Sequence, residues 1–179
     1  MSKISILSAS PRRKGNSSQL CDAFMRGAQE AGHEVEKLIV SHRNIGACLA
    51  CNTCMRNGGS CVQKDDMREI RDKMLEADVI VLASPVYFYS VNAQMKLVID
   101  RCYAFFQKLT GKTFYYLLSM ASPNAETADA ALATLRGLVR CVPESKEGGY
   151  VLAAGVAETN DVQDSAALKE AFELGKNVQ

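Results

Sequence analysis

A chain of 179 residues with 47% hydrophobic residues is long enough to bury most of its unfolded surface in one core, so its stability does not require disulfides. Its 21 basic residues nearly balance 20 acidic residues, and the formal charge of +1 argues against nucleic acid or an anionic membrane as a partner. No apolar stretch approaches the roughly 18 residues of a membrane span, and basic residues follow the first apolar run, which is the reverse of a signal peptide. We therefore expect a single cytoplasmic domain, residues 1–179, in a reducing compartment.

Short apolar strands alternate with amphipathic helical patterns along the first half of the chain. A strand over 4–9 leads into a helix with apolar residues at helical spacing from Leu20 to Ala31, and a second strand covers 35–40. Asp65 and Asp66 are expected to cap a helix that follows a long connection. The run 78–83 is apolar on both faces, as expected of a central strand in a covered sheet.

The same alternation continues to the end of the chain. An apolar helical stripe extends from Met95 to Leu109, and the patterns then predict a strand over 112–119, a helix over 126–140, a strand over 150–154 and a helix over 167–176. Five strands separated by helices imply parallel pairing with right-handed crossovers. The sequence thus predicts an α/β fold, a three-layer doubly wound sheet of five parallel strands, with its ligand at the carboxyl ends of the strands.

The connection over 41–64 is too long for an ordinary link, and its cysteine-rich part, at about 44–64, interrupts the pattern as an insertion. Its cysteines have the spacing C-x2-C-x2-C-x6-C, and are Cys48, Cys51, Cys54 and Cys61. One tight loop with this spacing supplies three thiolates and a later cysteine the fourth, which favours a [4Fe-4S] cluster. Four-thiolate zinc, a redox-active dithiol at Cys48 and Cys51, and four free thiols are the alternatives.

The remaining cysteines, Cys21, Cys102 and Cys141, are isolated in the sequence. Cys21 and Cys102 fall on apolar helical stripes. We interpret all three as core or incidental thiols rather than ligands.

The loop after the first strand, residues 8–18, combines hydroxyls, an amide and basic side chains with the start of a helix. Free backbone N–H groups and the helix dipole at such a position favour an anion, so we expect a phosphate site rather than a plain polar turn. Only Gly15 is present of the three glycines of a dinucleotide fingerprint, and no P-loop motif occurs. Flavin mononucleotide (FMN) is the remaining phosphate ligand common on this architecture.

Two further loops follow strands of the predicted sheet. The loop 84–91 contains three successive aromatic residues, Tyr87 to Tyr89, which suit a flat heterocycle; a subunit contact is the alternative. The loop 119–124, which includes Ser122, is small and polar, as either a ring contact or a plain turn would be.

These motifs resemble one known family. The residues 10–18, the cysteine segment running into 62–67, the loop 84–91 and the segment 171–177 together closely resemble the iron-sulfur flavoprotein branch of the NAD(P)H-dependent FMN reductases. The resemblance covers nearly the whole chain and implies a flavodoxin-like fold, FMN, a [4Fe-4S] cluster on the four cysteines in members that assemble it, and a homodimer or homotetramer. It assigns the phosphate to Ser10, Arg12, Asn16, Ser17 and Ser18, and the flavin ring to Pro85, Val86, Tyr87, Phe88 and Ser90.

The leading hypothesis is an FMN-dependent oxidoreductase. It would pass electrons from NAD(P)H or a reduced carrier through FMN, with or without a [4Fe-4S] cluster, to a small-molecule or protein acceptor. No side chain is expected to act as acid, base or nucleophile, because the cofactor carries the chemistry. An electron-transfer flavoprotein without turnover and a thiol-based redox sensor are the alternatives.

Overall fold

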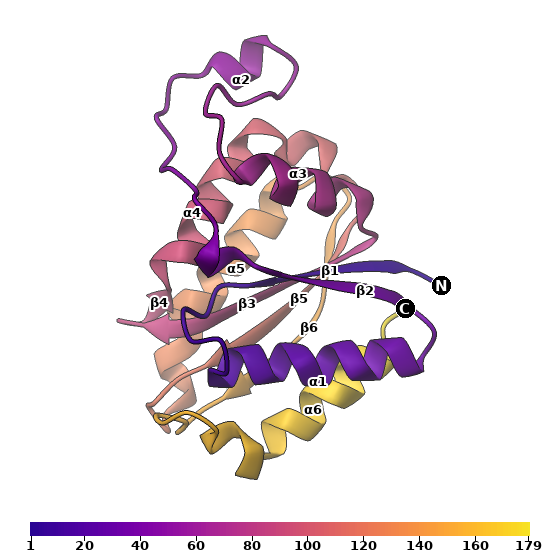
Figure 1. The fold of residues 1–179 in the computed structure, drawn as a ribbon, viewed down its shortest axis with the longest axis vertical. Helices are drawn as coiled ribbons and strands as arrows, with labels where there is room; N and C mark the ends of the chain where they lie inside the picture. Colours follow the sequence, from indigo (N-terminus) through magenta and orange to yellow (C-terminus); the bar gives the residue numbers. More distant parts are fainter.

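Five strands of the chain pair in parallel and form a twisted sheet in the order β2-β1-β3-β5-β6 (Figure 1). The computed structural model describes residues 1–179, and the strands are β1 (Lys3–Ser8), β2 (Glu34–Ile39), β3 (Val79–Tyr87), β5 (Thr113–Ser119) and β6 (Lys146–Ala153). Their register places Leu7 opposite both Leu38 and Leu82. The predicted five-stranded parallel sheet is confirmed. A short strand that the sequence did not predict, β4 (Ser90–Val91), pairs antiparallel with the end of β3.

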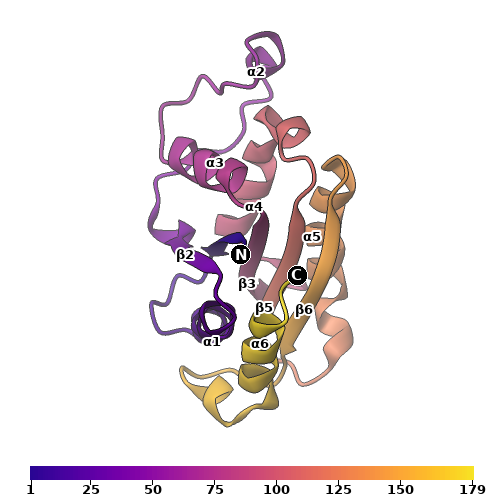
Figure 2. The ribbon, with the colours of Figure 1, turned by 90° about the vertical axis from the view of Figure 1, so that its right-hand side faces the viewer.

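Helices cover both faces of this sheet and produce three layers (Figures 1 and 2). One face is covered by α1 (Asn16–Glu30) and α6 (Ala166–Lys176), and the other by α3 (Met67–Glu76), α4 (Ala93–Arg101) and α5 (Asp129–Cys141). Short turns complete the chain: η1 (Val40–His42), α2 (Thr53–Arg56), η2 (Cys102–Ala104), η3 (Phe106–Lys108), η4 (Ala125–Ala128) and η5 (Asp161–Asp164). No helix is long and apolar enough to cross a membrane.

The sequence suggested one helix along the apolar stripe from Met95 to Leu109, but the structure does not contain a single helix there. The α-helix ends at Arg101, and two 3-10 turns carry the chain onward. Cys102, Phe105 and Leu109 are nevertheless all buried, so the stripe still faces the core although the helical geometry changes.

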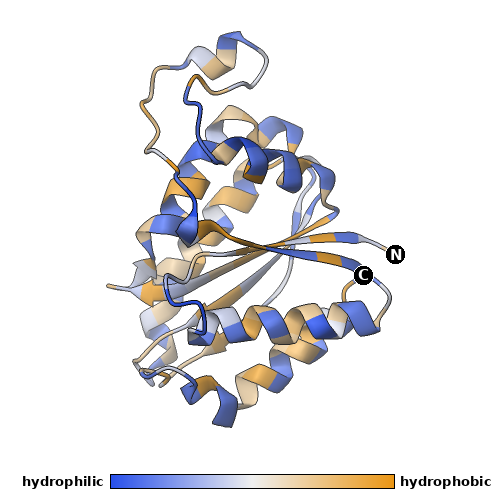
Figure 3. Cartoon of the chain, viewed as in Figure 1, coloured by the Kyte–Doolittle hydropathy of each residue, from blue (hydrophilic) through white to orange (hydrophobic).

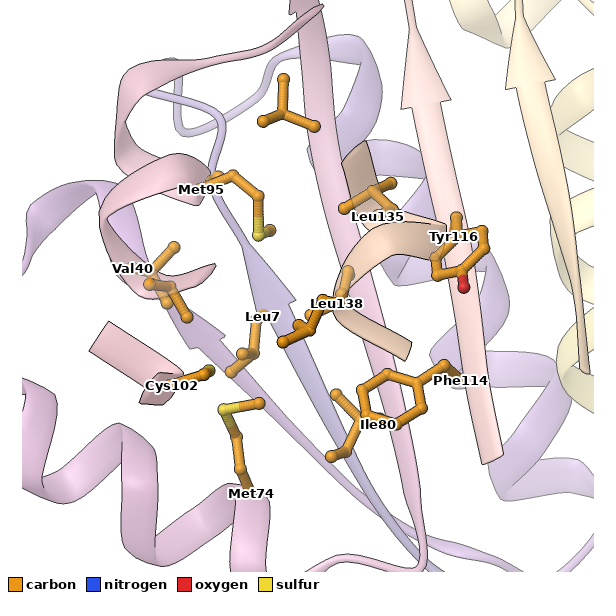
Figure 4. Packing of buried hydrophobic residues seen from close by; sticks show 14 of the residues in the cluster. Leu7, Val40, Met74, Ile80, Met95, Cys102, Phe114, Tyr116, Leu135 and Leu138 are labelled. Carbon is orange, nitrogen blue, oxygen red and sulfur yellow. The ribbon is translucent and has the colours of Figure 1, made fainter. Parts of the chain in front are cut away.

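The larger core cluster lies between the sheet and the helices α3, α4 and α5. Figure 4 shows Leu7 and Ile80 of the sheet in one cluster with Met74 of α3, Met95 of α4 and Leu138 of α5. Each is almost completely buried, which contributes roughly 1.5–3 kcal/mol per side chain relative to exposure. Hydrophobic residues accordingly occur along the strands, while α3 and the segment entering it are largely hydrophilic on their outer side (Figure 3).

On the opposite face, α1 and α6 approach each other through a pair of glycines. A Cβ atom on Gly27 would overlap the carbonyl oxygen of Phe172, and one on Gly175 would overlap the carbonyl oxygen of Phe24. The two helices therefore pack backbone against backbone, which only residues without a side chain permit.

The cysteine-rich insertion protrudes beyond α3 and α4 and carries the short helix α2 at its tip (Figure 1). No residue between Ile45 and Met67 is buried. The insertion therefore adds nothing to the core, and polar contacts attach it, both at its base and through hydrogen bonds of Tyr103 to Asn52 and of Lys108 to Gly58.

Candidate functional site

The carboxyl ends of the parallel strands surround a cavity of about 250 Å³. The loop before α1 and the end of β3 contribute Ser10, Arg12, Gly15, Asn16, Ser17, Pro85, Val86 and Tyr87. Segments after β5 and β6 complete its wall with Ser119, Met120, Ala121, Val156 and Ala157. The predicted first and second loops thus meet at one site, as the parallel topology requires.

The first loop folds back tightly before α1 begins. The Gly15 N–H donates to the carbonyl oxygen of Arg12 at 3.0 Å, and the Ser10 hydroxyl donates to the same oxygen at 3.1 Å. A Cβ atom on Gly15 would lie 2.6 Å from the Ser10 hydroxyl, so a larger residue would force the loop open.

The start of α1 presents unused hydrogen-bond donors to this cavity. The backbone N–H groups of Asn16, Ser17 and Ser18 have no acceptor within the chain. The Ser17 side chain is buried against the cavity, and its hydroxyl has no hydrogen-bond partner in the chain. Together with the helix dipole, these donors can bind an anionic group.

The other residues predicted to bind the phosphate differ from Ser17 in what their side chains contact. The Arg12 guanidinium lines the cavity and reaches the carbonyl oxygen of Ala157 at 3.5 Å. The Asn16 amide holds the chain after β6 by donating to the carbonyl oxygens of Val156 and Glu158 at 3.3 and 2.9 Å. Ser18 does not line the cavity, because its hydroxyl points to β2 and accepts from Lys37 Nζ at 2.8 Å.

The aromatic loop after β3 is a tight hairpin. Phe88 and Tyr89 form its two-residue turn, with φ of 48° and 66°, between Tyr87 and its partner Ser90 on β4. Positive φ at bulky residues costs roughly 1–3 kcal/mol each. Phe88 is 100% exposed, and neither it nor Ser90 lines the cavity, whereas Pro85, Val86 and Tyr87 do.

A buried hydrogen-bond network joins the first and second loops beneath the cavity. The Asn92 amide nitrogen donates to the carbonyl oxygen of Ala9 at 2.6 Å, and the Asn92 N–H donates to the Ser84 hydroxyl at 3.0 Å. The Asn92 side-chain oxygen caps α4 by accepting from the Met95 N–H at 3.1 Å. The sequence interpretation missed Asn92; an asparagine directly before a helical pattern was the available signal.

The third loop enters the site through residues other than the predicted one. Met120 and Ala121 line the cavity, but the Ser122 hydroxyl bonds to Thr127 Oγ1 at 3.0 Å and accepts from the Asn124 N–H. Val156 and Ala157 were also missed. Their only sequence signal is that they follow the last parallel strand.

The four cysteines of the insertion line a second, smaller cavity. Cys48, Cys51, Cys54 and Cys61 all contribute to its wall, and all four are free thiols. No three of these thiols lie close enough together to form a ligand group for a metal ion. Hydrogen bonds from the Thr53 backbone, and then from its side chain, lower the pKa of Cys51, which favours the thiolate form.

An ion pair between buried Arg101 and Asp65, whose side chain is 9% exposed, closes the base of the insertion. Arg101 Nη1 donates to Asp65 Oδ2 at 2.6 Å and Nη2 donates to Asp65 Oδ1 at 3.0 Å. Asp65 Oδ2 also accepts from the Gly46 N–H, and Oδ1 accepts from the Met67 N–H, so Asp65 rather than Asp66 caps α3. Burial alone would raise the pKa of Asp65, but the Arg101 and backbone hydrogen bonds outweigh it and lower that pKa.

The three isolated cysteines are separate from both cavities described above. Cys21 and Cys102 are fully buried, and burial raises the pKa of each to about 12. Cys141 is exposed, so it is not a core residue.

Several sequence relatives of this chain are iron-sulfur flavoproteins. An iron-sulfur flavoprotein of Archaeoglobus fulgidus is 43% identical over 115 residues, which are 64% of this chain and 51% of that protein. An iron-sulfur flavoprotein of Methanosarcina thermophila is 39% identical over 99 residues, or 55% of this chain and 51% of that protein. The chain thus spans about half the length of these curated relatives.

The fold has many solved counterparts. The NAD(P)H:quinone oxidoreductase of Methanothermobacter marburgensis superposes with a TM-score of 0.78 at 22% identity, covering 98% of this chain and 95% of that one. The expected flavodoxin-like architecture and the resemblance to iron-sulfur flavoproteins are both confirmed. The model of the NADPH-dependent FMN reductase family matches residues 2–148, and the chain therefore belongs to that family.

Proposed function

We propose that this protein is an FMN-dependent oxidoreductase that takes electrons from NAD(P)H or a reduced carrier and delivers them to a small molecule or protein. The observation that carries the proposal is the cavity at the carboxyl ends of the strands, where unpaired donors of α1 face apolar residues of β3. Membership of the FMN reductase family supports the choice of FMN.

The two ends of the cavity suit the two ends of FMN. The N–H groups at the start of α1, the Ser17 hydroxyl and Arg12 would bind the terminal phosphate, a dianion that benefits from charge-assisted hydrogen bonds. Pro85, Val86 and Tyr87 would lie against the isoalloxazine ring. FMN supplies transfer of a hydride or of single electrons, and the chain positions it and limits its contact with water.

We further propose that the four cysteines of the insertion bind a [4Fe-4S] cluster. Their soft thiol donors fit iron, and all four line a common cavity, although the loop would have to draw them closer together. The names of the curated relatives support this choice over zinc, a dithiol pair or inert thiols.

Self-association of the chain is a further part of the proposal. The hairpin beside the cavity exposes Phe88 completely and Tyr89 to 65%, in a conformation that is strained for both residues. A homodimer or homotetramer that buries this hairpin would recover the cost of exposing two aromatic rings.

The flavin site is tested by comparing two neighbouring serines. We expect Ser17→Ala to weaken FMN binding by about 10- to 100-fold, because a hydrogen bond to a charged group contributes roughly 1.5–3 kcal/mol. Ser18→Ala is the matched control. It should leave the affinity for FMN within about twofold of wild type, because the Ser18 hydroxyl faces Lys37 and not the cavity. Equal losses in both variants, measured by fluorescence titration of the apoprotein, would contradict the proposed placement of the phosphate.

Turnover and cofactor content separate the remaining alternatives. Steady-state oxidation of NADH and NADPH with quinone or ferric acceptors should proceed catalytically, whereas stable reduction without turnover would identify an electron carrier. Iron, sulfide, zinc and flavin analysis of anaerobically prepared protein should find FMN and iron. If the protein contains FMN but no iron, the proposed cluster is wrong and the proposed flavin site still stands.

A further inference from the structure

Tyr116, in the middle of β5, has a buried hydroxyl without a hydrogen-bond partner in the chain. The residue is 0% exposed, and no donor or acceptor of the chain is within hydrogen-bond reach of its hydroxyl oxygen. Almost all buried polar groups in native proteins have a partner, because an unpaired one is destabilising. A phenylalanine would fill this core position without that cost, so the hydroxyl needs an explanation.

The hydroxyl is directed toward the amino-terminal end of the sheet. Figure 4 shows it on the side of Phe114, two residues earlier on the strand. Phe114 is opposite Glu147 in the register of β5 and β6, so the hydroxyl is aimed at the start of β6. A cavity of about 340 Å³ lies there, and its wall consists of Tyr116, Arg136, Val139, Arg140, Ser145, Lys146 and Glu147. None of these residues lines the cavity at the carboxyl ends of the strands.

Three basic side chains and one acidic side chain share this cavity with the hydroxyl. Arg136 donates to Glu147 through Nε and Nη2, at 2.8 and 2.9 Å, and its Nη1 has no acceptor. Arg140 and Lys146 are exposed, and neither side chain forms an ion pair or a hydrogen bond. Three cations against one carboxylate leave the cavity with a formal charge of +2.

We propose that this cavity binds the phosphate group of a small metabolite, with the Tyr116 hydroxyl, Arg140 and Lys146 as its donors. A phosphate monoester carries close to two negative charges at neutral pH and balances the excess charge, whereas a simple carboxylate carries one. Guanidinium and ammonium groups are the usual phosphate ligands among side chains. The volume is within the range of small-molecule sites, roughly 300–1,000 Å³, which leaves room for an organic group on the phosphate.

The surroundings determine which groups can hold this phosphate. Burial, and next the charge of Glu147, raise the pKa of Tyr116, so its hydroxyl stays protonated and can donate. The helix α5 ends at Cys141 beside the cavity, and the carbonyl groups at a helix C-terminus repel anions. Side chains and not the helix dipole must therefore bind the phosphate, and Arg140 in the last turn of α5 offsets the negative end of the helix.

The test follows binding residue by residue in the full chain. Inorganic phosphate is titrated into isotope-labelled protein at constant ionic strength, and the shifts of the backbone amide signals are recorded by NMR. Amides 145–147 report on this cavity, and amides 16–18 report on the start of α1, where we propose that the FMN phosphate binds. The two sites are thereby measured separately, with or without bound FMN. Glycerol 3-phosphate and acetate are the second and third probes.

We expect saturable shifts at amides 145–147 with phosphate, binding of glycerol 3-phosphate at least as tight, and binding of acetate weaker by about tenfold or more. Absence of saturable shifts there overturns the proposal. Acetate that binds as tightly as phosphate overturns the assignment of a dianion. Glycerol 3-phosphate that binds more weakly than inorganic phosphate shows that the free anion, and not a metabolite, is the ligand.

Variants identify the donors. Tyr116→Phe and Arg140→Gln should each lower the phosphate affinity at amides 145–147 by about fivefold or more. Arg26→Gln is the matched control, because Arg26 is an exposed arginine of α1 that lines neither cavity, and it should stay within about twofold of wild type. Equal losses in Arg26→Gln and Arg140→Gln would show general charge attraction and overturn the site. An unchanged affinity in Tyr116→Phe overturns the role of the hydroxyl.

A stability measurement separates a ligand-binding hydroxyl from one that serves the fold. Because the Tyr116 hydroxyl has no partner in the chain, Tyr116→Phe should not lower the Tm in the absence of phosphate. Added phosphate should raise the Tm of wild type more than that of Tyr116→Phe, since only a ligand that binds the folded state stabilises it. A Tyr116→Phe protein that is less stable than wild type without phosphate, and gains as much from phosphate, contradicts the proposal.

Discussion

Asp65 is the residue on which the base of the insertion depends. It accepts hydrogen bonds from both Nη groups of Arg101 and from two backbone N–H groups, and its side chain is 9% exposed. Removing one partner of a buried pair leaves the other charge uncompensated in the protein interior. We expect Asp65→Asn to lower the free energy of unfolding by about 3–5 kcal/mol at pH 7, measured by urea denaturation.

The pH dependence of this contribution follows from the direction of the pKa shift. The pKa of Asp65 is lowered on folding from its ordinary value of 3.8, so the stabilisation is complete above that value and lost as the pH falls through the lower folded-state pKa. The difference between wild type and Asp65→Asn should therefore be constant from neutral pH to about pH 5 and shrink in stronger acid. Asp100→Asn, which breaks an exposed pair with Lys96, is the control and should cost less than about 1 kcal/mol.

Asn92 has a comparable role next to the cavity at the carboxyl ends of the strands, where we propose that FMN binds. Asn92→Ala would remove the cap of α4 and leave the Ala9 carbonyl without its partner in a buried position, while the backbone N–H of residue 92 would still donate to the Ser84 hydroxyl. The loss of a cap costs about 1 kcal/mol and an unpaired buried group about 1–3 kcal/mol, so we expect a decrease of about 2–4 kcal/mol in the free energy of unfolding. Asn124→Ala, which removes an exposed cap, should cost less. Similar losses in the two variants would argue against a structural role for the buried network.

At the scale of elements, the contact between α1 and α6 depends on glycine. Gly27→Ala would place a methyl group against the backbone of Phe172, which can be accommodated only by separating the helices. We expect the free energy of unfolding, measured by thermal denaturation, to fall by about 1–3 kcal/mol or more. Gly137→Ala on α5 is the matched control: nothing lies within 4 Å of its Cβ position, so the change should stabilise the protein by about 0.5–1 kcal/mol. If Gly137→Ala instead destabilises the protein, intrinsic helix propensity does not determine the stability effect at that position.

Elements with strong periodicity could be predicted from the sequence, and those formed by tertiary contacts could not. The five parallel strands follow from their apolar patterns. The end of α4 at Arg101 was missed because Cys102, Phe105 and Leu109 continue the apolar stripe in 3-10 geometry. The strand β4 was missed because its turn contains Phe88 and Tyr89 at positive φ, where Asn-Gly would be the usual signal.

In the candidate site too, the position of a loop could be predicted from the local sequence, whereas the direction of each side chain could not. The strand-loop-helix order placed the loop 8–18 at the carboxyl edge of the sheet, and the family resemblance chose residues within it. Of these, Ser10, Arg12, Asn16 and Ser17 line the cavity. The direction of a side chain is set by its neighbours across the fold. Ser18 points to Lys37 and Ser122 to Thr127, and neither partner is evident from the local motif.

At the scale of the whole molecule, the insertion is an addition to a fold that is complete without it. Its two ends meet at the body, where the Gly46 N–H donates to Asp65 Oδ2 at 2.9 Å and Arg101 bonds to both residues. Every residue that lines the proposed FMN cavity lies outside the insertion. The core is also independent of it, since no residue between Ile45 and Met67 is buried.

Replacement of residues 47–64 by a Gly-Ser-Gly linker should therefore leave a protein that folds cooperatively and binds FMN. We expect a change of no more than about 1–2 kcal/mol in the free energy of unfolding, because the entropy of loop closure depends weakly on length. The FMN dissociation constant should stay within about threefold of wild type, while bound iron is lost. A full-length variant with all four insertion cysteines changed to serine separates loss of thiols from loss of the segment. If the serine variant binds FMN normally and the shortened chain does not, the insertion completes the flavin site, which in this fold would require it to reach the cavity of a second copy of the chain.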